Sequence, residues 1–158
     1  MTDLIHSVTL ESLRDMAQAL GFRATLADGP DGVRTLQSAA SGLGFEIRLG
    51  NPAPDGEDGA VDFRFVTAIR VEGQLDLALV NSWNNDRRFG RLRLDGQALA
   101  LDLDASVAGG VAPAHLASQF EIWNRLIGAL MDVLRSGGRT ESAPAQAAPR
   151  RERAAASA

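Results

Sequence analysis

Apolar residues recur along this chain at two spacings, which predict helices at both ends and strands between them. Residues 10–20 carry leucine, methionine and alanine at the three- and four-residue steps of a helix, after Thr9 as a candidate N-cap and before Gly21 as the stop. A longer helix is predicted to enter at Pro113 and to end at Gly137. Its apolar stripe consists of Leu116, Phe120, Trp123, Ile127, Leu130 and Leu134.

Alternation of apolar and polar residues predicts six strands in two groups. Four strands precede a shorter helix, on which Leu75, Leu79 and Trp83 share one face before the helix ends at Asn84 and Asn85. Two strands follow it as a hairpin around an Asp-Gly turn. The strands are predicted at residues 23–27, 33–38, 45–49, 63–71, 92–94 and 99–103.

The predicted order of the elements is α-β-β-β-β-α-β-β-α. Because the strands are grouped rather than alternating with helices, we expect an α+β fold with an antiparallel sheet and helices packed on one face. In the second hairpin, leucine can face leucine in two registers: a two-residue loop pairs Leu92 with Leu99, and a four-residue loop pairs Leu94 with Leu99. The Leu94 register sets Arg91 opposite Asp102. Asp102 and its neighbour Asp104 alternate with leucines and are therefore predicted to point into water.

Composition divides the chain into a folded part and a tail. Residues 1–138 are expected to form one α+β domain, since a chain of this length can bury enough surface to fold alone. Residues 139–158 carry no large apolar side chain, so burial cannot compensate for the entropy of ordering them. We therefore expect a disordered tail rich in arginine, alanine and proline.

The residue types that the chain lacks exclude several functions. Without cysteine, lysine or tyrosine there are no disulfides, no thiolate metal sites and no Schiff-base chemistry. The 16 basic residues, all arginine, stand against 20 acidic ones for a net charge of −4, which disfavours nucleic-acid binding. No stretch approaches the roughly 18 apolar residues of a membrane span, and the first residues do not resemble a signal peptide. We expect a cytoplasmic protein that binds neither nucleic acid nor membrane.

No group of residues predicts a catalytic or metal site. His6, in an N-terminus expected to fray, and His115, in the first turn of the last helix, have no partner at motif spacing and are expected on the surface. The acidic loop at residues 55–59 lacks the central glycine and the closing glutamate of a calcium loop. We therefore expect no enzymatic activity, no metal and no cofactor.

The segment that joins the second helix to the next strand is the candidate binding surface. Tryptophan and arginine, which are enriched at binding hot spots, are concentrated there. In the alternative interpretation the segment is scaffold: Trp83 anchors the helix, Asn84 or Asn85 caps it and Phe89 begins a core strand. The candidate residues are Trp83, Asn84, Arg87, Arg88, Phe89 and Arg91.

The same segment resembles the YbjN family, described as bacterial sensory transduction regulators. The shared pattern is Trp83-Asn84, three further residues, and then Arg88-Phe89-Gly90. A hairpin, a Gly-Val pair and a long helix with a central tryptophan follow it. The resemblance covers about residues 8–134. It implies a regulator without catalytic residues, and the family's fold is similar to that of type III secretion chaperones, which bind partner chains.

These observations favour a non-enzymatic regulatory or chaperone-like module that binds a protein partner. One alternative is a structural homodimer, built by packing the last helix against its twin, although its stripe is short for a coiled coil. The other is an enzyme of a type that the motifs do not reveal.

Overall fold

The computed structural model describes residues 3–54, 57–74 and 76–136. Within them the chain forms three helices and six strands in the predicted order, which confirms the α+β prediction. Leu75, Gly137 and the predicted tail at residues 139–158 lie outside the described residues. The elements are α1 (Leu10–Ala19), β1 (Ala24–Asp28), β2 (Arg34–Ala40), β3 (Leu43–Leu49), β4 (Asp62–Arg70), α2 (Leu77–Asp86), β5 (Arg91–Asp95), β6 (Ala98–Ser106) and α3 (Pro113–Arg135).

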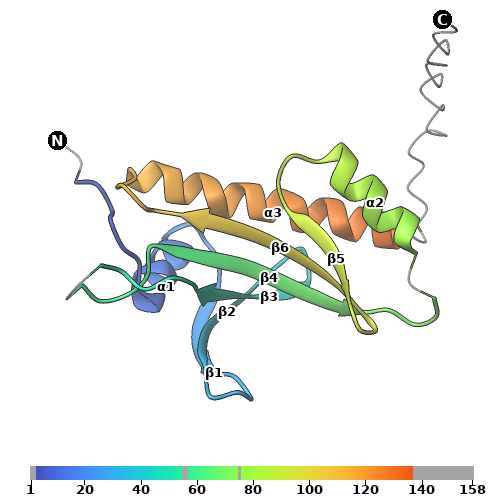
Figure 1. The fold of residues 1–158 in the computed structure, drawn as a ribbon, viewed down its shortest axis with the longest axis horizontal. Helices are drawn as coiled ribbons and strands as arrows, with labels where there is room; N and C mark the ends of the chain where they lie inside the picture. The colour runs from blue at the N-terminus through green and yellow to red at the C-terminus, as the bar shows by residue number, and fades with distance from the viewer. Residues whose placement is uncertain (1–2, 55–56, 75, 137–158) are drawn as a thin grey trace, which may run out of the picture.

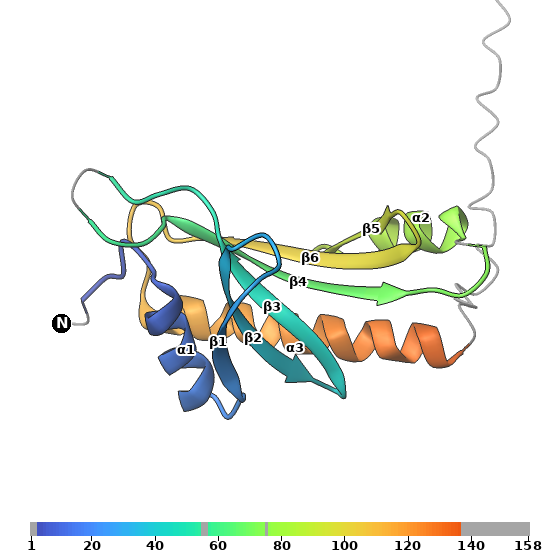
Figure 2. The ribbon, with the colours of Figure 1, turned by 90° about the horizontal axis from the view of Figure 1, so that it is seen from below.

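The described strands make one antiparallel sheet with the order β1-β2-β3-β4-β6-β5. α3 runs along one face of this sheet, and α1 packs at the end where β1, β2 and β3 twist away from the other strands (Figures 1 and 2). α2 lies beside β5, which is an edge strand (Figure 1). The opposite face of the sheet is not covered by α1 or α3 (Figure 2).

The core lies between the sheet and α3, and aromatic rings fill its centre. Phe65 of β4 stacks on Trp123 of α3 with ring centroids 5.3 Å apart and meets Phe120 edge-on at 5.0 Å. The predicted apolar stripe of α3 is buried from Leu116 to Leu130, but Leu134 is only half-buried and Val133 takes the last core position.

The second hairpin has the register that pairs Leu94 with Leu99 and sets Arg91 opposite Asp102. Asp95 and Ala98 pair as well, so the connection is a two-residue turn of Gly96 and Gln97 and not the four-residue loop expected with this register. Leucine therefore faces leucine across these two strands, as the alternation predicted.

Two predictions from the sequence are wrong. Asp102 does not point into water: its side chain is 2% exposed, because Arg91 and Arg93 of the neighbouring strand β5 lie over it. The N-terminal segment is not frayed, since Ile5 pairs with Val111 and Val8 with Ala60 through backbone hydrogen bonds of 2.7–3.0 Å. Alternation identifies the face on which a side chain lies, but it does not show what covers that face.

Candidate functional site

The segment from Trp83 to Arg91, called the corner below, connects the end of α2 to the start of β5. α2 begins at the N-cap Asp76, whose carboxylate accepts a hydrogen bond from the Ala78 amide at 2.8 Å. It ends where Arg87 takes an extended conformation with a φ of −118°, and its amide donates to the Trp83 carbonyl at 3.1 Å. The chain thus changes from helix to edge strand within four residues.

Trp83 fixes the corner to the body of the protein. Its side chain is 2% exposed, and its Nε1 lies 3.4 Å from the Gly90 carbonyl oxygen, to which it donates. Gly90 has a φ of +78°, and a Cβ there would lie 2.8 Å from Leu126 Cδ1 of α3. The backbone conformation therefore favours glycine at this position, and a Cβ there would in addition displace the side chain of Leu126.

Asn84 joins α2 to β5 rather than capping the helix. Its Nδ2 donates to the Leu92 carbonyl at 2.9 Å, and its Oδ1 accepts from the Leu92 amide at 3.0 Å. A side-chain amide thereby satisfies both backbone groups of one residue on the edge strand, in place of a neighbouring strand.

Arg87 lies over the outer face of the Trp83 ring, with its guanidinium carbon 4.2 Å from the ring centroid. This is the geometry of a cation–π contact. Arg88 and Phe89 extend from the corner into solvent, and Phe89 is 53% exposed. The alternative in which Phe89 begins a core strand is wrong, because β5 starts at Arg91 and Phe89 is exposed.

The exposed part of the corner borders a groove of about 300 Å³ against α3, called the corner groove below. Three side chains of α3 complete it, and sequence reasoning did not find them, since they lie more than thirty positions along the chain. The only hint in the sequence is that Arg125 falls off the apolar stripe of the last helix. The lining residues are Asp86, Arg87, Arg88, Phe89, Ile122, Arg125 and Leu126.

Arg91 faces a different part of the surface from Phe89. Its Nη2 donates to Asp102 Oδ2 at 3.1 Å, and Arg93 Nε donates to the same oxygen at 2.7 Å. Burial alone raises the pKa of Asp102, but the hydrogen bonds from Arg93 and Arg91 and the charges of Arg93 and Arg64 together lower it below the ordinary carboxyl value. Arg91 is therefore committed to Asp102, although it also borders an open groove with Arg87 and Arg88.

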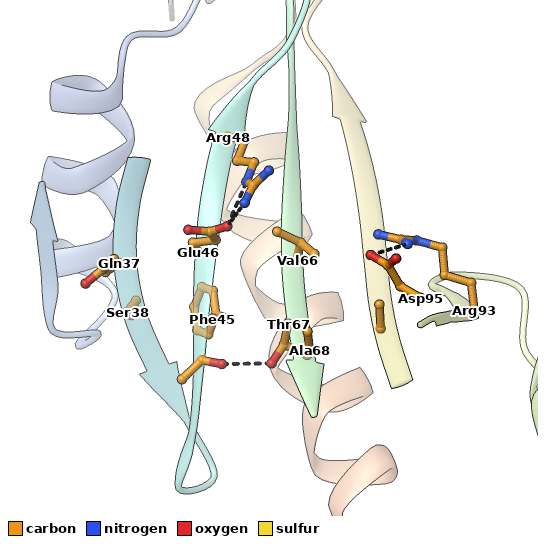
Figure 3. A pocket seen from close by; sticks show the side chains of 12 residues that line it. Gln37, Ser38, Phe45, Glu46, Arg48, Val66, Thr67, Ala68, Arg93 and Asp95 are labelled. Carbon is orange, nitrogen blue, oxygen red and sulfur yellow. Dashed lines mark hydrogen bonds and ion pairs between the residues drawn. The ribbon is translucent and has the colours of Figure 1, made fainter. Parts of the chain in front are cut away.

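A second hollow, of about 440 Å³, lies on the sheet face opposite α3 (Figure 3). Val66, Ala68 and Ala100 are among its lining residues, and its charged residues are already paired, Arg48 with Glu46 and Arg93 with Asp95. In the part of the chain that the structure describes, Arg88 and Arg125 make no ion pair. Free cations beside an exposed aromatic ring therefore distinguish the corner groove from the sheet hollow.

The described residues contain no group of three or more His, Cys, Asp or Glu side chains that could hold a metal ion. His6 and His115 are both exposed, as predicted. Among the same residues, no helix has the length and apolar character needed to cross a membrane.

The fold and the corner define a small α+β protein with a six-stranded sheet over the described residues and a rigid, arginine-rich joint at its edge. The YbjN family, described as "Putative bacterial sensory transduction regulator", matches residues 9–136. The chain belongs to this family, as the Trp-Asn and Arg-Phe pattern indicated. No curated protein and no solved structure matches it.

Proposed function

We propose that this protein is a regulatory module that works by binding a segment of a partner protein in the corner groove. One observation carries the proposal: the pattern that identifies the family divides into residues with an internal role and residues without one. Trp83, Asn84 and Gly90 hold the corner in place, whereas Arg88 and Phe89 face solvent beside the groove. An exposed aromatic side chain on a rigid joint loses little entropy on contact with a partner.

The neighbouring residues support the same role. Arg87 and Arg88 present guanidinium groups that can fork onto carboxylates or stack on rings, and α3 adds apolar surface from Ile122 and Leu126. This mixture of an aromatic anchor, arginines and a small apolar floor is the composition of a binding hot spot. The proposal extends to a chaperone-like mode, in which a client segment is held in extended or helical form, and to action in the cytoplasm.

A homodimer through the last helix is the weaker alternative. The stripe from Leu116 to Leu130 packs against the sheet of its own chain, so it offers no apolar face for a twin. An obligate dimer would need a different surface, and sedimentation of the purified protein at micromolar concentration tests for it.

Capture of partners by the full chain tests the proposal. The variant is Arg88→Ala combined with Phe89→Ser, because both side chains are exposed and both border the groove. The control is Leu77→Ser, which removes an equally apolar side chain, 70% exposed, from the other end of α2. We expect both variants to have the melting temperature of the parent protein, and only the double variant to lose the partner that the wild type retains. Full retention by the double variant contradicts the proposal.

A further inference from the structure

We infer that the partner segment is acidic and carries one large apolar side chain between its carboxylates. This inference rests on the proposed function and adds the chemistry of the partner. The corner groove holds three arginines, Arg87, Arg88 and Arg125, against one carboxylate, Asp86. The whole chain is negative, at −4, so this positive local charge opposes the charge of the protein as a whole.

The arrangement of the groove gives each part of such a segment a place. The apolar surface consists of Phe89, which is half exposed, Ile122, which is half-buried, and Leu126 beneath them. Arg88 stands on the corner side of this surface and Arg125 on the α3 side. Neither has an ion-pair partner among the described residues, so binding a carboxylate breaks no existing pair. An apolar anchor in the middle with carboxylates on both sides satisfies all of these groups.

Other occupants fit the groove less well. The chain's own residues 139–158 contain four arginines and two glutamates, so their net charge has the same sign as the groove. A second copy that docked its own corner there would also bring arginines against arginines. A nucleic acid would meet only these few cations on a protein of net negative charge, whereas phosphate neutralisation needs a broad basic surface.

The fluorescence of Trp83 can report binding in the corner groove. Its ring is covered by Arg87 at 4.2 Å, directly beside the groove, and the only other tryptophan is Trp123 in the core. A carboxylate that draws Arg87 away from the ring changes the surroundings of Trp83 and hence its fluorescence. The Trp123→Phe variant, in which Trp83 is the single remaining tryptophan, should keep this signal, which assigns it to the corner.

The experiment titrates the full-length protein with three short synthetic peptides. One has a central phenylalanine flanked by glutamates, the second has alanine in place of the phenylalanine, and the third has lysines in place of the glutamates. We expect saturable binding of the first peptide, and binding at least about tenfold weaker for each of the others, which corresponds to about 1.4 kcal/mol. A single-stranded oligonucleotide that binds as well as the first peptide would overturn the inference.

Charge reversal gives the sharpest variant. Arg88→Glu combined with Arg125→Glu should lower the affinity for the acidic peptide by about tenfold or more and raise the affinity for the lysine peptide. Arg70→Glu is the matched control, since Arg70 is exposed at the end of β4, away from the groove, and should leave both affinities unchanged. The inference is supported if the charge-reversal variant prefers the lysine peptide to the acidic one and keeps the melting temperature of the parent protein.

The outcomes separate this inference from the proposed function. If the Arg88/Phe89 variant loses its captured partner but the acidic peptide does not bind, then the corner groove is the binding surface and the inferred acidic character of the partner segment is wrong. If sedimentation shows self-association that Phe89→Ser abolishes, the occupant is a second copy, and the acidic segment is also wrong.

Discussion

The side chain of Asn84 forms two hydrogen bonds with the backbone of Leu92, donating to its carbonyl at 2.9 Å and accepting from its amide at 3.0 Å. Asn84 is on a helix and Leu92 is on the edge strand that follows it, so this contact sets the position of α2 relative to the sheet. The corner groove depends on that position, because its two sides come from the end of α2 and from α3.

Replacing Asn84 should therefore loosen the corner. Asn84→Ala removes both hydrogen bonds, each worth about 1 kcal/mol, so we expect a loss of about 2 kcal/mol in the free energy of unfolding. Hydrogen exchange of the Leu92 amide should become faster, because that donor is left to water. Asn85→Ala is the control, since Asn85 is an exposed neighbour outside this contact. Unchanged exchange at Leu92 in Asn84→Ala contradicts this role.

Asp102 should contribute to stability in a pH-dependent way. Asp102→Asn weakens the charge-assisted hydrogen bonds from Arg91 and Arg93, and we expect a loss of about 2 kcal/mol near neutral pH. The pKa of this carboxyl is lowered in the folded protein, so its contribution is complete above the ordinary carboxyl pKa of about 4. The contribution is lost as the pH falls through the folded value. Chemical denaturation of both proteins at several pH values should show the difference shrinking under acid conditions.

The ion pair between Asp104 and Arg64 provides a control for the prediction on Asp102. Asp104 accepts from Arg64 Nε at 2.6 Å, but the Asp104 side chain is largely in solvent and that of Arg64 is only half-buried. Asp104→Asn should therefore cost no more than about 1 kcal/mol. Equal losses for Asp102→Asn and Asp104→Asn would mean that the burial of Asp102 adds nothing.

Trp123 should be indispensable to the core. It is fully buried, and its ring stacks on Phe65, so Trp123→Ala leaves a large cavity and should cost about 3–5 kcal/mol. No described residue accepts a hydrogen bond from its buried Nε1, so packing alone holds the ring. Trp123→Phe should consequently cost clearly less than the alanine variant. Thermal melts of the two proteins test this, and a Trp123→Ala variant as stable as the parent would contradict the assignment of α3 to the core.

Residues 139–158 should contribute almost nothing to stability. They carry no side chain that could bury a useful apolar area. Deleting them should change the melting temperature by less than about 2 °C, since even 1 kcal/mol shifts a domain of this size by more. A larger decrease would mean that this segment docks on the domain.

The spacing of apolar and polar residues predicts the elements, their order and the faces of most residues. The period of the apolar positions sets helix or strand, and the opposed leucines of the second hairpin allowed only registers that keep them on one side. For the same reason, the α3 stripe could be identified as core and the aromatic Trp83 as an anchor. These properties depend on residues close together in the chain, where spacing alone carries the information.

What covers each surface depends on how the elements pack together. Asp102 is buried because Arg91 and Arg93 of its hairpin partner strand lie over it, and Phe89 lies 53% exposed beside Leu126 of a distant helix. Arg125 reaches the corner only once α3 has crossed the sheet. Contacts between residues far apart in the chain depend on how the elements pack in space. Periodicity along the chain predicts the face on which a residue lies, but it does not predict that packing.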